Sequence, residues 1–172
     1  YRAGGFAAQP AGKLLRALAE TGFSIESSVV HGLYREKPCP LDYRSAPAGR
    51  RMWRVRDEVC REDATGLLWE LPVHSVMRRR LHQMTPRRVL AKFSRNVPKA
   101  RQKEMVDQLG LRAHPVARAR FMCQPVPIKL DFDNLTPRQL IKMIRSAPQP
   151  VDGDPDVLML IGHTKEHIRS ES

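Results

Sequence analysis

The chain has 172 residues, with 30 Lys or Arg against 18 Asp or Glu and a formal net charge of +12. Its apolar content of 41% suffices for one core, so the composition excludes wholesale disorder and its length predicts a single domain over residues 1–172. No run approaches the roughly 18 apolar residues that a membrane span needs, and the start, which lacks Met, does not resemble a signal peptide. We therefore expect a chain that begins inside a longer protein.

The first 51 residues predict a helix, a strand and a long loop, in that order. Residues 11–21 place leucines on one face, and Gly22 follows as a helix stop. Residues 23–30 alternate and include β-branched side chains, which favours a strand. Residues 31–51 are rich in proline and arginine and lack periodicity, which indicates a long loop or insertion.

The middle of the chain predicts two strands and two helices. Residues 52–55 form a weak strand candidate, and residues 66–73 form a better one because their apolar run suits a strand buried on both faces. Residues 76–93 contain a predicted helix with a boundary or kink near Pro86, and residues 99–109 are compatible with a further short helix.

The last third has the clearest pattern. Residues 128–133 alternate like a strand or an extended segment, and Thr136 followed by Pro137 predicts the capped start of a helix. Residues 157–161 form a five-residue apolar run between turn signals, which predicts a fully buried parallel strand. The sequence thus predicts an α/β fold.

His163 is the strongest catalytic candidate, because it follows the last predicted strand and active sites of α/β folds gather beyond the carboxyl ends of parallel strands. His167 lies four residues later, but without an H-E-x-x-H pattern the pair does not predict a metal site. Asp131 and Asp133 are compatible with a carboxylate pair, although capping or solvation explains them better. Arg2, beside small residues, indicates a loop that projects a guanidinium.

Together these segments resemble the polysaccharide deacetylase family, which has the NodB-type homology domain and forms carbohydrate esterase family four. Residues 1–6 (YRAGGF) resemble its third motif, and residues 18–29 resemble the helix and strand that follow that motif. Residues 69–73 (WELPV) fit an intervening strand, and residues 160–163 (LIGH) resemble the fifth motif. The order and spacing of these short motifs carry the resemblance.

The resemblance implies a deformed (β/α) barrel whose amino-terminal strands are missing from this chain, and hydrolysis of N- or O-acetyl groups on a polysaccharide or glycolipid. It implies that His163 is the general acid, that Arg2 orients a base aspartate upstream, and that Phe6 and Ile161 line the substrate groove. It also implies a divalent metal, zinc or similar, whose ligands are not in this segment. Glu26 stands where many members have aspartate.

Two alternatives stay open: a non-enzymatic basic module that binds a polyanion, and a deacetylase-like pseudoenzyme. The expected partner is a glycan substrate, and nucleic acid is disfavoured because charge alone is weak evidence for it. The three cysteines form no C-x-x-C pair, which favours a reducing compartment and hence the cytoplasm. The sequence leaves the oligomeric state undetermined.

Overall fold

The computed structural model describes residues 1–83, 115–132, 135–151 and 155–162, and it shows a mixed α/β chain with small sheets. The chain divides into two compact units, which we call unit 1 (Tyr1–Val76 with Lys129–Ser172) and unit 2 (Met77–Ile128). The single domain inferred from length stays a prediction. No described helix is both long and apolar enough to cross a bilayer.

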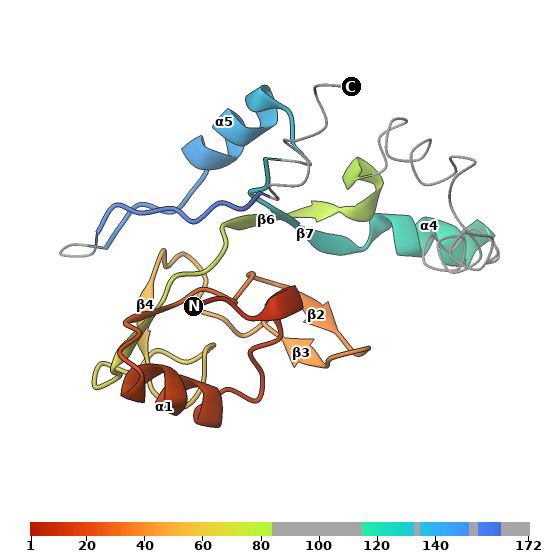
Figure 1. The fold of residues 1–172 in the computed structure, drawn as a ribbon. Helices are drawn as coiled ribbons and strands as arrows, with labels where there is room; N and C mark the ends of the chain where they lie inside the picture. The colour runs from red at the N-terminus through yellow and green to blue at the C-terminus, as the bar shows by residue number, and fades with distance from the viewer. Residues whose placement is uncertain (84–114, 133–134, 152–154, 163–172) are drawn as a thin grey trace, which may run out of the picture. The chain divides into compact units, whose positions relative to one another are not determined.

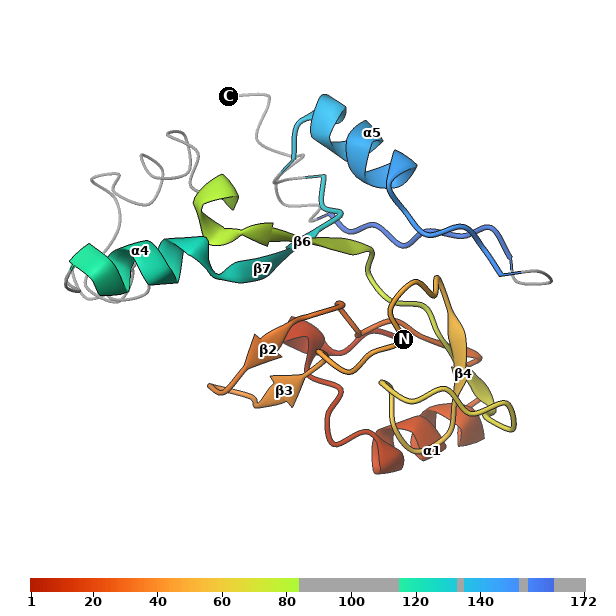
Figure 2. The same cartoon turned by 180° about the vertical axis from the view of Figure 1, so that it is seen from behind.

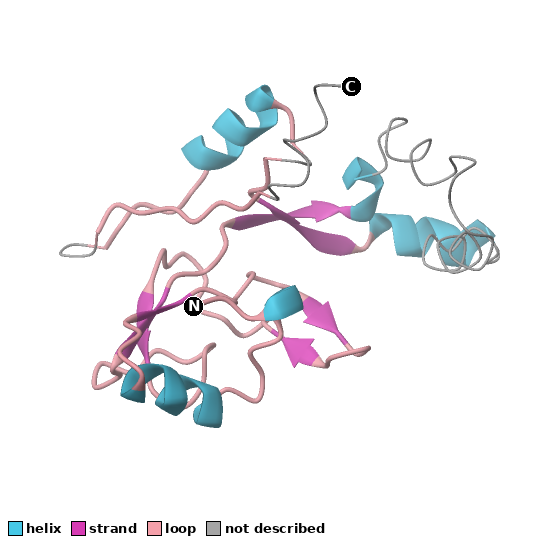
Figure 3. Cartoon of the chain, in the orientation of Figure 1, coloured by secondary structure: helices cyan, strands magenta, loops and turns pink. Residues whose placement is uncertain are grey.

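Unit 1 contains most of the regular structure (Figures 1 and 3). Its helices are the short 3-10 helix η1 (Gly4–Phe6), α1 (Gly12–Glu20) and α5 (Pro137–Arg145), and its strands are β1 (Ile25–Glu26), β2 (Tyr34–Arg35), β3 (Leu41–Asp42), β4 (Trp53–Val55) and β5 (Leu68–Glu70). Unit 2 contains the 3-10 helix η2 (Arg80–Gln83), the helix α4 (Pro115–Cys123), and most of the paired strands β6 (Ser75–Arg79) and β7 (Pro125–Lys129). The first two residues of β6 and the last residue of β7 are counted in unit 1.

Helix α1 confirms the first predicted helix. Its leucines at positions 15 and 18 are buried in a core that includes Trp53 and Leu68. The helix ends because Gly22 takes a φ of +84°, a left-handed conformation that glycine adopts without strain. Thr21 caps this end, donating its hydroxyl to the Ala17 carbonyl at 2.7 Å. Helix α1 therefore covers the core through the face that the leucine spacing predicted.

Strand β5 lies between β1 and β4, so the strands predicted at residues 52–55 and 66–73 are confirmed in part of their length. It pairs in parallel with β1, placing Glu26 opposite Glu70, and antiparallel with β4. An isolated parallel bridge joins Val30 to Val73 beyond the assigned strands. The short β1 thus continues as an extended segment through most of the range predicted for it.

Residues 76–79, the first part of the range predicted to contain a helix, belong to strand β6, and residues 80–83 form the 3-10 helix η2. Residues 84–114, which include the predicted boundary near Pro86 and the second predicted helix at 99–109, lie outside the described part. Pairing of β6 with β7 satisfies backbone groups that a helix would otherwise have satisfied internally. Long-range pairing has overridden the local helical pattern.

The fully buried strand predicted at residues 157–161 is also wrong in its burial. Val157 is exposed, and only Ile161 within this run is buried. The run does pair in parallel, through isolated bridges at Met159 and Ile161. Its first residues have no such partner, which explains their exposure.

Helix α5 confirms the predicted start at Thr136. The Thr136 hydroxyl accepts from the backbone of Gln139, and the Gln139 side chain accepts from the Thr136 backbone, which forms a capping box. Residues 31–51 hold the β2–β3 pair within the predicted loop. The described residues form no closed barrel.

Candidate functional site

The carboxyl ends of four parallel segments of unit 1 supply the candidate site. Val73 bridges in parallel both to Val30 and to Met159, and Asp131 bridges in parallel to Ile161. The Ile161 amide donates to the Leu130 carbonyl at 3.0 Å, which joins the last two segments. Because parallel strands end at the same edge, side chains that follow these segments gather there.

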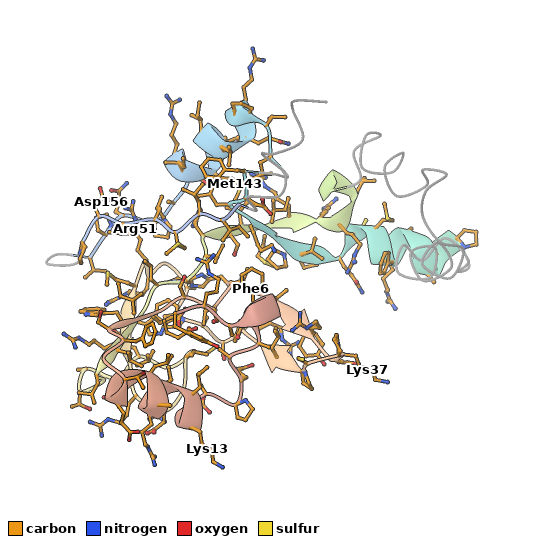
Figure 4. The ribbon with its side chains drawn as sticks, in the orientation of Figure 1. Phe6, Lys13, Lys37, Arg51, Met143 and Asp156 are labelled. Atoms are coloured by element: carbon orange, nitrogen blue, oxygen red, sulfur yellow. The ribbon has the colours of Figure 1, made fainter. Side chains whose placement is uncertain are left out.

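Arg51 holds the chain that leads into residue 159. Its guanidinium donates to the Pro148 carbonyl at 2.5 Å and forms an ion pair with Asp156, and Figure 4 shows these two side chains side by side. The Arg51 side chain is mostly buried, whereas the Asp156 side chain is exposed to solvent. The contact joins residue 51 to the connection between α5 and the segment of Met159.

Arg2 is anchored to the chain just after β1. Its Nε donates to the Ser27 carbonyl at 2.9 Å and its Nη2 donates to the Ser27 hydroxyl at 3.1 Å. The next backbone amide, that of Ala3, donates to the Ser28 hydroxyl at 2.8 Å. These contacts pair the amino-terminal segment with the end of β1 and orient a guanidinium over it.

Phe6 and Ile161 pack in one apolar cluster, although they stand near opposite ends of the chain. Ile161 is buried with Val30 and Val73, and Phe6 packs against this group. Phe6 has a φ of +63°, an uncommon conformation for a residue with a side chain, and it costs about 1–3 kcal/mol of backbone strain. The Tyr43 hydroxyl holds this turn by donating to the Phe6 carbonyl at 2.5 Å.

Lys129 completes the arrangement, and no pattern in the sequence selects it. Its Nζ lies 4.5 Å from the centre of the Phe6 ring, a cation–π contact. Burial lowers the pKa of Lys129, the Asp131 carboxyl opposes that change, and the Arg2 charge adds to it. Asp131 is buried, which corrects the expectation that it caps a helix or is solvated. The edge therefore combines two cations with an apolar wall.

Beneath this edge, Glu26 and Glu70 face each other in the parallel register and are fully buried. Glu26 accepts from the Ser28 hydroxyl and from the Ser28 amide, the latter at 2.9 Å. Glu70 Oε1 accepts from the Val29 amide at 3.1 Å, whereas its Oε2 receives no hydrogen bond. Burial and the Glu26 carboxyl raise the pKa of Glu70 well above its usual value, so Oε2 is the atom suited to carry a proton toward Glu26.

This pair predicts a pH-dependent stability. The pKa of Glu70 in the folded protein lies above the ordinary value of 4.5. Protonated Glu70 therefore contributes fully to the free energy of unfolding below pH 4.5, and this contribution is lost as the pH rises toward the folded-state pKa. Glu70→Gln, whose amide can donate to Glu26, is expected to raise the free energy of unfolding at pH 8 by about 1–3 kcal/mol and to flatten its pH dependence. Urea unfolding at pH 5 and pH 8 measures this, with Glu20→Gln on the surface as the control. Equal responses of the two variants would contradict the assignment.

His163, the predicted general acid, lies outside the described residues, so its distance from Arg2 stays a prediction. The structure brings Phe6 and Ile161 into one cluster and anchors Arg2 at the end of β1. Among the described residues, no group of three or more His, Cys, Asp or Glu side chains could hold a metal ion.

No protein-family model, curated protein or solved structure matches the chain.

Proposed function

We propose that the chain is part of a metal-dependent hydrolase that removes N- or O-acetyl groups from a glycan, and that it supplies the side of the site that protonates the leaving group. The observation that carries the proposal is the packing of Phe6 against the cluster of Ile161. The motif resemblance assigned both residues to one groove, and nothing local in the sequence requires them to be near each other. Four parallel segments ending at one edge also suit a partial, deformed (β/α) barrel completed by strands outside this chain.

Each residue has a distinct part in this proposal. Phe6 and Ile161 form an apolar wall that excludes water and accommodates the acetyl methyl group. Arg2, fixed by Ser27, orients a base carboxylate by a charge-assisted hydrogen bond. His163 donates a proton to the departing amine nitrogen or alkoxide oxygen as the bond from that atom to the acyl carbon breaks.

The metal ion belongs to the other side of the site. The described residues do not form a ligand set, so its ligands would come from elsewhere in the protein. When bound, a divalent ion of this kind activates water and polarises the acyl carbonyl.

Acetate release from N-acetylglucosamine oligomers and from an acetylated xylan tests the proposal. The longer protein that includes this chain is expected to release acetate, to lose activity with a chelator and to regain it with Zn²⁺ or Co²⁺. The 172-residue chain alone is expected to be inactive, because the base and the metal ligands are supplied elsewhere. Acetate release by the isolated chain, or none from the metal-loaded longer protein with any acetylated glycan, would overturn the proposal.

A further inference from the structure

The positive charge of this chain is concentrated in unit 2. Between Met77 and Ile128 the sequence has thirteen Lys or Arg and two Asp or Glu, whereas the remainder has seventeen and sixteen. Unit 2 therefore carries +11 of the formal +12, and unit 1 is close to neutral. A uniform preference for arginine across the whole chain would have raised the charge of both units.

The described part of unit 2 carries five of these thirteen basic residues, and it exposes two of them on a two-stranded ribbon. Met77, Arg78 and Arg79 follow one another along β6 and are all exposed. Figure 2 shows β6 beside β7, with α4 leading into β7. The two adjacent exposed arginines give this ribbon a cationic surface.

Apolar side chains are exposed beside the arginines. Met77 on β6 is 49% exposed, Leu81 on η2 is 57% exposed, and Val116 on α4 is 71% exposed. Arg120, one turn after Val116 on α4, is exposed as well. A surface that mixes cations with protruding apolar groups matches an anionic lipid interface, where headgroups attract the cations and the acyl boundary takes the apolar groups.

In the described part of unit 2, the aromatic side chain is already engaged by an arginine. Phe121 is the one aromatic side chain in the described part of this unit, and the Arg80 guanidinium lies over its ring at 4.0 Å from the centroid. The Arg80 amide also donates to the Gln124 carbonyl at 2.9 Å, so Arg80 joins β6 to the α4–β7 connection. The ring face under Arg80 is thus not available to stack a base, and such stacking is one of the contacts that hold single strands.

We propose that unit 2 docks on a membrane surface rich in anionic phospholipid headgroups, through the exposed arginines and apolar residues of β6, η2 and α4. Three arginines near such a surface, each contributing about fivefold, together raise the affinity on the order of 100-fold. The proposal does not depend on the hydrolase activity, since it concerns binding by a different part of the chain.

Vesicle co-sedimentation of the full 172-residue chain tests the docking. The chain is expected to sediment with vesicles of equal parts phosphatidylcholine and phosphatidylglycerol, and high salt is expected to release it. With vesicles of pure phosphatidylcholine, the chain is expected to stay in the supernatant. An arginine variant of unit 2 is expected to lose on the order of 100-fold in affinity, and an apolar variant roughly tenfold. These variants are Arg78→Gln/Arg79→Gln/Arg120→Gln and Met77→Ser/Leu81→Ser/Val116→Ser.

A matched control removes the same charge from exposed arginines of unit 1, in Arg16→Gln/Arg138→Gln/Arg145→Gln. This control is expected to keep its vesicle affinity, because its substitutions leave the exposed arginines of unit 2 in place. Equal losses in the control and the unit 2 arginine variant would overturn the proposal. The absence of sedimentation with anionic vesicles would overturn it as well. A third contrary result is an apolar variant with unchanged vesicle affinity, together with duplex DNA binding that depends on the same arginines. Circular dichroism of each variant separates lost binding from lost folding.

Discussion

Replacing His163 by Ala in the longer protein is expected to lower kcat by about 100- to 10,000-fold while leaving its metal content unchanged. The imidazole is proposed to protonate the leaving group, and without it a poor leaving group departs as an anion or takes its proton from water. Because substrate binding is proposed to depend on the wall formed by Phe6 and Ile161, KM should change little. Acetate release and metal analysis on the same preparation measure both quantities.

His167→Ala is the matched control, because His167 stands four residues later and has no assigned role. The pH profile separates an acid from a structural residue. A general acid must be protonated, so wild-type kcat falls on the alkaline side, and the His163→Ala variant should lack that decline. Unchanged turnover in His163→Ala, or equal losses in both variants, would remove the general-acid role.

Local signals predicted those elements whose determinants lie within a few residues. Helix α1 follows from leucine spacing and a glycine stop, and α5 follows from Thr136 with Gln139 three positions later. Both helix boundaries are set by backbone groups close in sequence. The strands β4 and β5 were located for the same reason, although their pairing partners were not.

Features that depend on distant partners were missed. No strand is predicted for residues 75–79, but pairing with β7, about 50 residues later, makes them one. Lys129 belongs to the site because it meets the Phe6 ring, and Glu70 is buried opposite Glu26 because β1 and β5 are in parallel register. None of these long-range contacts produces a recurring pattern of residues in the sequence. The packing of Phe6 against the cluster of Ile161 joins residues near opposite ends of the chain, and no local pattern predicts it.

Trp53→Ala is expected to lower the free energy of unfolding of unit 1 by about 3–5 kcal/mol. The Trp53 side chain is fully buried in the main core, and its indole nitrogen donates to the Val59 carbonyl at 2.9 Å. Its ring meets the His31 ring edge-to-face at a centroid distance of 5.7 Å. Truncation therefore removes a large packed volume and leaves a buried carbonyl without its donor. Urea denaturation followed by far-UV circular dichroism measures the change.

Trp69→Ala provides the comparison within the same sheet. Trp69 is half-buried on β5 and lies under the Arg54 guanidinium, 4.4 Å from the ring centroid, so its loss should cost about 1 kcal/mol. The difference in stability loss between the two variants bears on the candidate site. Strand β4, which carries Trp53, flanks β5, and the segment that continues β5 ends at Val73 in that site. If the core organised around Trp53 supports that edge, Trp53→Ala should weaken acetate release by the longer protein at temperatures where Trp69→Ala does not. Equal stability losses in the two variants would mean that the core does not depend on Trp53 in this way.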